Sequence, residues 1–192
     1  MIRAIFLDVD GTLISFSTHE IPASALRALA QAHERGVRLF IATGRAANDL
    51  GPLEGILYDG VVSLNGARCV ANDGRVVSLH PIPRADFERA LALSEEQGFA
   101  MGLELEEGVF VNRVTPDVER VAHMVAHPVP EQTDLRELFG RVECCQLCFY
   151  FDAETQRRVM AELPTLAASR WCPIFADVNV AGIDKAIGME EF

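Results

Sequence analysis

The pair Asp8 and Asp10 is the feature of this sequence with the clearest chemical potential. The pair follows directly on a short apolar run, Ile2–Leu7, which is typical of a buried parallel strand. Ligands of open α/β sheets bind at the carboxyl ends of such strands. One carboxylate there can attack a phosphorus atom as a nucleophile. The other can pass a proton to the leaving oxygen and later take one from water.

The same pair also predicts a metal. Crowded carboxylates require a hard divalent cation, and Mg²⁺ prefers oxygen ligands, so we expect a magnesium site at Asp8 and Asp10. Gly11 follows them and permits the tight turn that brings backbone amides close to a phosphate. The loop after the first strand is therefore predicted to bind both a metal and an anion.

The segments that position this loop alternate between strand and helix patterns. Pro22 suits the start of a helix, and Gly36 suits its end. A second buried strand is expected at Val37–Ala42, followed by a short helix that Arg45 opens. This order of elements predicts an α/β fold with a Rossmann-like parallel sheet.

The middle of the chain has a different character and is predicted to form a second domain. A strand at Val61–Leu64 and a hairpin around Asn72-Asp73-Gly74 come first, and Pro81 and Pro83 mark a boundary. Beyond it we expect helices at Phe87–Gln97, Pro116–Ala126 and Glu154–Leu163, and strands at Met101–Leu105, Val109–Asn112, Gln146–Phe151 and Phe175–Val178. We therefore predict a core of residues 1–81 and 181–192, into which residues 82–180 are inserted as an α+β domain.

Four short motifs resemble those of the haloacid dehalogenase superfamily, in the same order along the chain. Asp8-Val9-Asp10-Gly11-Thr12 is similar to the first motif of that family, and Thr43-Gly44-Arg45 is similar to the second. Asn65-Gly66-Ala67 resembles an element of the Cof-like branch, which carries an inserted α+β cap of type IIB. Lys185, within Gly182-Ile183-Asp184-Lys185, resembles the third motif.

The resemblance implies a function and a set of roles. Asp8 would be the phosphate-accepting nucleophile and Asp10 the acid and base of a phosphatase that acts on small phosphorylated metabolites, sugar phosphates first. Mg²⁺ would bind the Asp8 carboxylate and the Asp10 backbone carbonyl, and the cap would close over the site. The groups expected to hold the phosphate are Thr43, at a helix N-terminus, Gly44, Gly11 and Lys185. The candidates for contact with the rest of the substrate are Asn65, Arg45 and Arg113.

One motif of the family is not found in these 192 residues. It has the form Gly-Asp-Gly-x-x-Asp and supplies further Mg²⁺ ligands, so the core is expected to be incomplete at its C-terminus and the activity of this chain to be low. Two alternatives remain open. A phosphomannomutase-like enzyme would retain the phosphoryl group, and a catalytically inactive module would bind phosphate without turnover.

Composition narrows the choice of partners. The net charge of -11 repels nucleic acids, and 49% hydrophobic residues indicate a globular chain. No apolar run approaches the length of a membrane span, and the N-terminus does not resemble a signal peptide. Five cysteines without a signal favour reduced thiols in a cytoplasm. The sequence carries no indication of oligomeric state.

Two further clusters are interpreted as structural. Cys145 and Cys148 have the spacing of a metal or redox motif, but they fall in a predicted strand, which favours buried cysteines. Glu104, Glu106 and Glu107 lie near a predicted turn, where a solvated face is expected.

Overall fold

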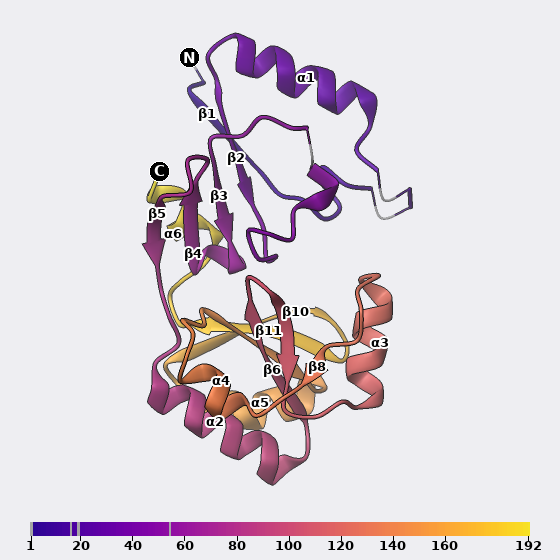
Figure 1. Ribbon diagram of the computed structural model, residues 1–192, viewed down its shortest axis with the longest axis vertical. Helices are drawn as coiled ribbons and strands as arrows, with labels where there is room; N and C mark the ends of the chain where they lie inside the picture. The colour runs from indigo at the N-terminus through magenta and orange to yellow at the C-terminus, as the bar shows by residue number, and fades with distance from the viewer. Residues whose placement is uncertain (1, 16, 19, 54) are drawn as a thin grey trace. The chain divides into compact units, whose positions relative to one another are not determined.

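The computed structural model describes residues 2–15, 17, 18, 20–53 and 55–192 (Figure 1). The chain forms two compact units. The first contains the residues up to Leu79 together with Ile183–Phe192, and the second is His80–Gly182. Each junction lies two residues from the boundary expected from the sequence. Assignment of the units as core and cap stays a prediction.

The first unit is built on a five-stranded sheet with the strand order β1-β2-β3-β4-β5. Its strands are β1 (Ala4–Leu7), β2 (Arg38–Ala42), β3 (Gly60–Ser63), β4 (Arg68–Ala71) and β5 (Val76–Leu79). The first three are parallel, and the hairpin β4–β5 adds two antiparallel strands. The predicted α/β class is therefore confirmed, with a parallel half and an antiparallel half.

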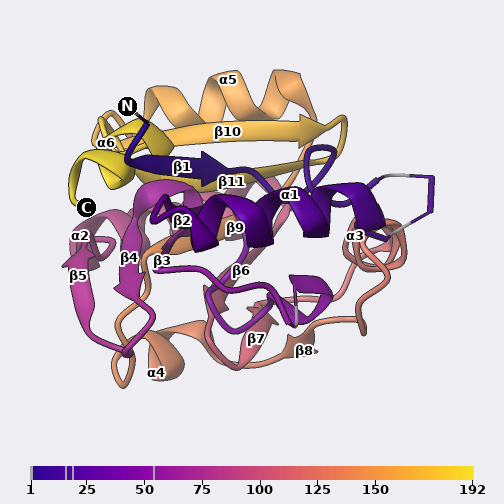
Figure 2. The ribbon, with the colours of Figure 1, turned by 90° about the horizontal axis from the view of Figure 1, so that it is seen from above.

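Alternate residues of these strands face opposite layers, as strand geometry requires. Ile41 and Val61 lie in a cluster with Leu29 of α1 (Ala23–Glu34), the helix drawn along the outside of the sheet in Figures 1 and 2. Their neighbours Ala42 and Val62 pack instead against Met189 of α6 (Lys185–Glu190). The first unit is thus a sheet between a long helix and a short one.

The parallel register brings the strand ends together. Leu7 pairs with Ile41, and Ala42 pairs with Val62, so β1, β2 and β3 end at the same edge of the sheet. The residues that follow these strands begin at Asp8, Thr43 and Leu64, and this edge is where ligands of such sheets bind.

The helix expected after Arg45 does not form. Residues 43–50 are irregular, with a bend at residues 44–45 and a turn at residues 47–48, and the 3₁₀ helix η1 (Gly51–Leu53) follows. The Thr43 hydroxyl oxygen accepts a hydrogen bond from the Arg45 amide at 3.2 Å, a local bond that competes with helical pairing. Only a few residues separate Arg45 from Gly51-Pro52, and a run that short does not sustain a helix.

The second unit is a six-stranded mixed sheet with helices, in the order β10-β11-β9-β6-β7-β8. Its strands are β6 (Ala100–Leu105), β7 (Gly108–Val111), β8 (Glu131–Gln132), β9 (Gln146–Tyr150), β10 (Leu166–Cys172) and β11 (Phe175–Val180). Its helices are α2 (Arg84–Gln97), α3 (Pro116–Met124), α4 (Leu135–Phe139) and α5 (Ala153–Ala161). No helix in the described part of the chain is long and apolar enough to span a membrane.

The two faces of this second sheet have separate cores. Leu147 and Phe149 of β9 belong to a large cluster with Phe87 of α2. Cys148 and Tyr150, which alternate with them, belong to a smaller cluster that includes Val118 and Val121 of α3. The prediction of an α+β arrangement is confirmed for this unit, although β8, β10 and α4 had not been expected.

Candidate active site

The shortest ion pair of the candidate site joins Asp8 to Lys185. Asp8 follows β1, Lys185 opens α6, and the Lys185 ammonium donates to Oδ1 of Asp8 at 2.7 Å. Both side chains remain partly open to solvent, at 43% exposure for Asp8 and 33% for Lys185. Lys185 is also the only lysine in the sequence, since all other basic side chains apart from histidine are arginines. The presence of a single lysine singles out Lys185 as a candidate site residue, independently of its resemblance to a motif.

Asp10 has a different partner. Arg45 Nε donates to one oxygen of the Asp10 carboxylate at 3.0 Å and Nη2 to the other at 2.8 Å, while Nη1 lies 3.5 Å from Asp49. A guanidinium fork fixes the orientation of a carboxylate, whereas an ammonium is a point charge. The two carboxylates therefore differ: Asp10 is held by both oxygens and Asp8 by one. Arg45 binds Asp10 here, and its predicted contact with the substrate stays a prediction.

The alternation of the loop explains why both carboxylates face outward. Val9, between them, is 1% exposed and packs with Leu13 and Ile14 in the first core. The Val9 carbonyl accepts amide hydrogen bonds from residues 12, 13 and 14, which closes the loop. Gly11 adopts φ 77°, a left-handed conformation that favours glycine. Its amide donates to the Ile14 carbonyl at 2.9 Å. Gly11 therefore supplies the predicted turn, and its part in phosphate binding stays a prediction.

Thr43 and Gly44 lie at the end of β2, beside the next strand. Thr43 is 1% exposed, and its amide donates to the Val62 carbonyl at 2.8 Å. No helix begins at Thr43, so the expected helix dipole is absent there, and phosphate binding by the Thr43 hydroxyl stays a prediction. A side chain at Gly44 would lie 3.1 Å from Oδ1 of Asn65, so Asn65 approaches this turn closely.

The available ligands fit part of a Mg²⁺ shell. The carboxylate of Asp8 and the backbone carbonyl of Asp10 are two hard oxygens on one loop, and Mg²⁺ requires six in an octahedron. Both carboxylate oxygens of Asp10 accept from Arg45. Within the described residues, a group of three acidic, His or Cys ligand atoms in metal-binding range occurs only in the second unit, at Glu104, Cys148 and Asp177.

That second cluster is a hydrogen-bonded network within the sheet of the second unit. The Gln146 amide donates to Glu104 at 3.3 Å and to Asp177 at 3.2 Å, and the Cys148 thiol donates to Glu104 at 3.4 Å. The solvated face expected at Glu104 is therefore wrong, because this side chain is half-buried and bonded. The prediction of buried cysteines is confirmed for Cys145 and Cys148.

Arg113 and its neighbour belong to the second unit. Arg113 follows β7, next to Asn112. The Asn112 side chain accepts from the Met101 amide at 3.0 Å and donates to the Ser94 hydroxyl at 2.8 Å. Asn112 thus fastens β6, β7 and α2 together, and the role of Arg113 toward a substrate stays a prediction.

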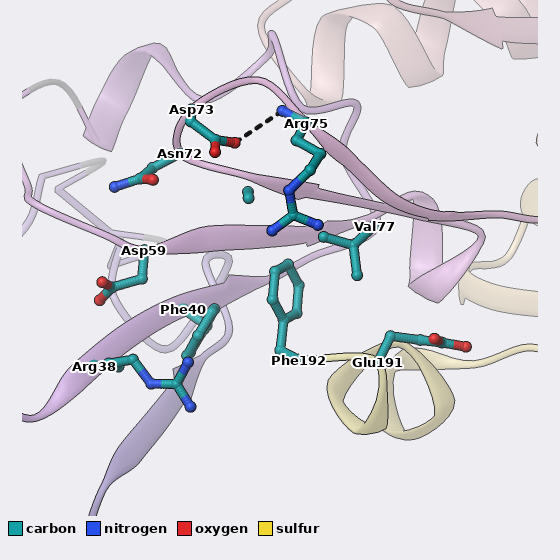
Figure 3. Close-up of a pocket in the computed structure, with 10 residues that line it drawn as sticks. Arg38, Phe40, Asp59, Asn72, Asp73, Arg75, Val77, Glu191 and Phe192 are labelled. Atoms are coloured by element: carbon teal, nitrogen blue, oxygen red, sulfur yellow. Dashed lines mark hydrogen bonds between the residues drawn. The ribbon is translucent and has the colours of Figure 1, made fainter.

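Two hollows mark the surface of the first unit. One, of about 400 Å³, is lined by the loop that follows Asp10 and by the start of α1, namely Gly11, Thr12, Leu13, Ser15, Ser17 and Pro22. The other, of about 270 Å³, is shown in Figure 3 and lies between the start of β2, the β4–β5 turn and Phe192. Arg38 begins the parallel strand β2, so this second hollow lies at the edge opposite Asp8. It contains none of the candidate site residues.

The fold agrees with comparison to known proteins. The model of the haloacid dehalogenase-like hydrolase family matches residues 5–192, so the chain belongs to that family. It is 54% identical to BT1666 from Bacteroides thetaiotaomicron, a phosphatase of the haloalkanoate superfamily, with a TM-score of 0.95 over 100% of this chain and 72% of that one.

Two further relatives are more distant. The subclass IIB sugar phosphatase BT4131 is 31% identical, with a TM-score of 0.88 over 98% of this chain and 74% of that chain. The protein YkrA of Bacillus subtilis (strain 168) is 26% identical over 195 residues, which cover 98% of this chain and 72% of YkrA. The chain therefore spans about three quarters of the length of the relatives that it matches.

Proposed function

We propose that this chain supplies the nucleophile, the acid–base group and the phosphate-binding residues of a Mg²⁺-dependent phosphatase. Its substrates would be small phosphorylated metabolites, with sugar phosphates as the first class. The observation that carries the proposal is the 2.7 Å contact between Asp8 and Lys185 at the carboxyl edge of a parallel sheet. An ammonium on a carboxylate nucleophile neutralises the charge that would otherwise repel an incoming phosphate.

The residues divide the reaction between them. An oxygen of Asp8 attacks phosphorus in line, the bond to the leaving oxygen breaks, and Asp10 gives that oxygen its proton. Asp10 then takes a proton from water, which attacks the acyl phosphate and releases inorganic phosphate and free Asp8. Thr43 and Lys185 hold the phosphoryl oxygens throughout. Mg²⁺, held by the Asp8 carboxylate and the Asp10 carbonyl, would supply further neutralisation of the phosphate charge.

Arg45 acts on this scheme through Asp10. Its fork occupies both oxygens of the Asp10 carboxylate, so one oxygen must leave the fork before Asp10 can carry the proton that it gives to the leaving oxygen. The unit His80–Gly182 would act as the cap that selects the leaving group. The likeness to the sugar phosphatase BT4131, at 31% identity, supports sugar phosphates as the first class to test.

The test measures Mg²⁺-dependent phosphate release from a panel of hexose and pentose phosphates. Since the acidic motif Gly-Asp-Gly-x-x-Asp is not found in these 192 residues, the assay uses a fusion of residues 1–192 to the part of BT1666 that this chain does not cover. We expect release that requires Mg²⁺. Isomerisation of the sugar without release would favour the mutase, and binding of phosphate without any turnover would favour the inactive module.

A further inference from the structure

An unusual turn connects β3 to β4 beside the candidate site. Leu64, Asn65 and Gly66 form the 3₁₀ turn η2, and all three have positive φ, at 49°, 55° and 97°. Leu64 is a buried leucine, for which this conformation is unfavourable. Three successive left-handed residues persist only where the surrounding structure imposes them.

One side of the turn touches the start of α6. A side-chain carbon built on Gly66 would lie 2.0 Å from the carbonyl oxygen of Asp184 and 3.1 Å from the amide nitrogen of Lys185. Both neighbours are backbone atoms, so neither can rotate away. Any residue larger than glycine at position 66 must therefore push away the first turn of α6, which carries Lys185.

The helix contributes a second glycine to the same contact. A side-chain carbon built on Gly188 would lie 2.5 Å from Cγ1 of Val62 and 3.0 Å from the α-carbon of Gly66. The Cys69 thiol also donates to the Gly188 carbonyl at 3.4 Å. The helix and the turn thus approach each other through glycines on both sides, and no side chain stands between them there.

The other side of the turn holds the loop after β2. The Leu64 amide donates to the Arg45 carbonyl, and the Asn65 amide donates to the Thr43 carbonyl, each at 3.0 Å. The Asn65 side chain lies against Gly44. One turn of three residues therefore touches both segments that are expected to hold a phosphate.

We propose that the turn Leu64-Asn65-Gly66 is the positioning element of this site, which sets Lys185 on Asp8 and fixes the Thr43-Gly44 loop at the same time. Gly66 and Gly188 are then positioning residues, since they touch neither a substrate nor the reacting atoms. The inference that this positioning serves to bind a phosphate rests on the proposed function. The positioning itself is a statement about Lys185 and can be tested without any activity.

The single lysine makes that test direct. The only amines that a reagent such as trinitrobenzenesulfonate can label are Lys185 and the terminal amine, and peptide mass mapping separates these two from each other and from any labelled cysteine. In Gly66→Ala, the displaced helix should release Lys185 from Asp8, and its labelling rate should rise about fivefold relative to the terminal amine. Gly74→Ala is the matched control, because Gly74 has φ 85° but nothing lies within 4 Å of its added carbon.

A second variant approaches the contact from the helix and covers the case in which Gly66→Ala does not fold. Gly188→Ala should also raise the labelling rate of Lys185, and the added change Val62→Ala removes the nearest obstacle and should lower the rate again. A general loss of stability would not be rescued in this way. An unchanged rate in both glycine variants, or an equal rise in Gly74→Ala, would overturn the proposal.

Affinity for inorganic phosphate separates this inference from the proposed function. We expect phosphate binding by the wild-type chain, and a loss of roughly tenfold in Gly66→Ala. If labelling responds as predicted while the wild-type chain does not bind phosphate at all, the positioning element stands and the proposed function fails. If phosphate binds and labelling does not respond, the positioning element fails alone.

Discussion

The ion pair of Asp8 and Lys185 is placed where it contributes little to stability. Both side chains are more than 30% exposed, and pairs of this kind contribute about 0–1 kcal/mol. The pair joins Asp8 to the single lysine of the chain, yet it adds little to the stability of the fold. A chemical role explains its presence better than a structural role does. Loss of function and loss of fold should therefore be separable at this position.

Asp8→Asn tests that separation. In the fusion with the BT1666 segment, phosphate release should fall by roughly a thousandfold or more, because an amide does not attack phosphorus. Urea unfolding of the same variant should show a change of less than about 1 kcal/mol. Asp73→Asn is a suitable control, since Asp73 lies in the β4–β5 turn, at the edge of the sheet opposite Asp8, and has no role in the proposed reaction. Turnover close to that of the wild type would rule out Asp8 as the nucleophile.

Cys144 predicts a pH dependence of stability in the second unit. Burial is the main cause that raises the pKa of its thiol, from 9.0 to about 12. The folded chain therefore keeps this proton more tightly than the unfolded chain does. The stabilisation is complete below pH 9 and is lost as the pH rises toward 12, by up to about 1.4 kcal/mol for each pH unit.

Urea unfolding at pH 8 and at pH 10.5 measures this effect. The free energy of unfolding should fall more steeply with pH in the wild type than in Cys144→Ala, which has no thiol at this position. Other buried groups titrate in both proteins and cancel in the comparison. Parallel pH profiles would show that the Cys144 thiol is not protected in the folded state.

At the level of single residues, the sequence pointed to the candidate site residues more readily than to the side chains that bind them. Asp8 and Asp10 stood out because two carboxylates directly after an apolar strand suit a chemical use. The fork from Arg45 to Asp10 could not be predicted, since it depends on a turn that replaced an expected helix. The hydrogen bond from the Gly11 amide to the Ile14 carbonyl could not be predicted either, since it depends on how the loop closes.

Among the elements, those with strong local signals were predicted well. The hairpin β4–β5 surrounds Asn72-Asp73-Gly74, whose turn chemistry is specific. By contrast, β10 contains two alanines and no valine or isoleucine, and it forms because β11 lies beside it. A strand that forms mainly because a neighbouring strand pairs with it is difficult to predict from its own residues.

The helix α3 offers a test at this level. Thr115 precedes it, and the Thr115 hydroxyl accepts a hydrogen bond from the Val118 amide at 3.4 Å. Thr115→Ala should lower the free energy of unfolding by about 1 kcal/mol, whereas Thr115→Ser keeps the hydroxyl and should lose much less. Thermal or urea unfolding compares the two, and equal losses would mean that the cap contributes nothing.

For the whole molecule, the chain passes from one unit to the other at two junctions, near residues 80 and 182, and these junctions predict where a protease cuts. Ala181 and Gly182 are exposed, and Pro81 is exposed in the other junction. Limited digestion with subtilisin should therefore cut first near residues 181–183, before any cut inside a helix or strand. Mass spectrometry of early fragments gives the positions, and cuts spread evenly along the chain would argue against two separate units.

The metal site gives a second prediction for the whole chain. With the Asp8 carboxylate and the Asp10 carbonyl as its protein ligands, Mg²⁺ would keep most of its shell as water. The 192-residue chain should therefore bind Mg²⁺ weakly and show negligible hydrolysis of an aryl phosphate. The measurement uses a sample whose intact mass matches 192 residues. Strong Mg²⁺-dependent turnover would show that other residues hold the metal.

The pairing of Asp8 with Lys185 also has a consequence for the order of folding. The two residues lie 177 positions apart, and the entire second unit is synthesised between them. The free energy needed to close a loop rises by only about 0.6 kcal/mol for each doubling of its length. The long separation therefore affects the rate at which the Asp8–Lys185 contact forms more than its final stability. During translation, Asp8 leaves the ribosome long before its ammonium partner exists. A nascent chain therefore carries Asp8 without its ion-pair partner, and the pair forms only when α6 returns to the first sheet.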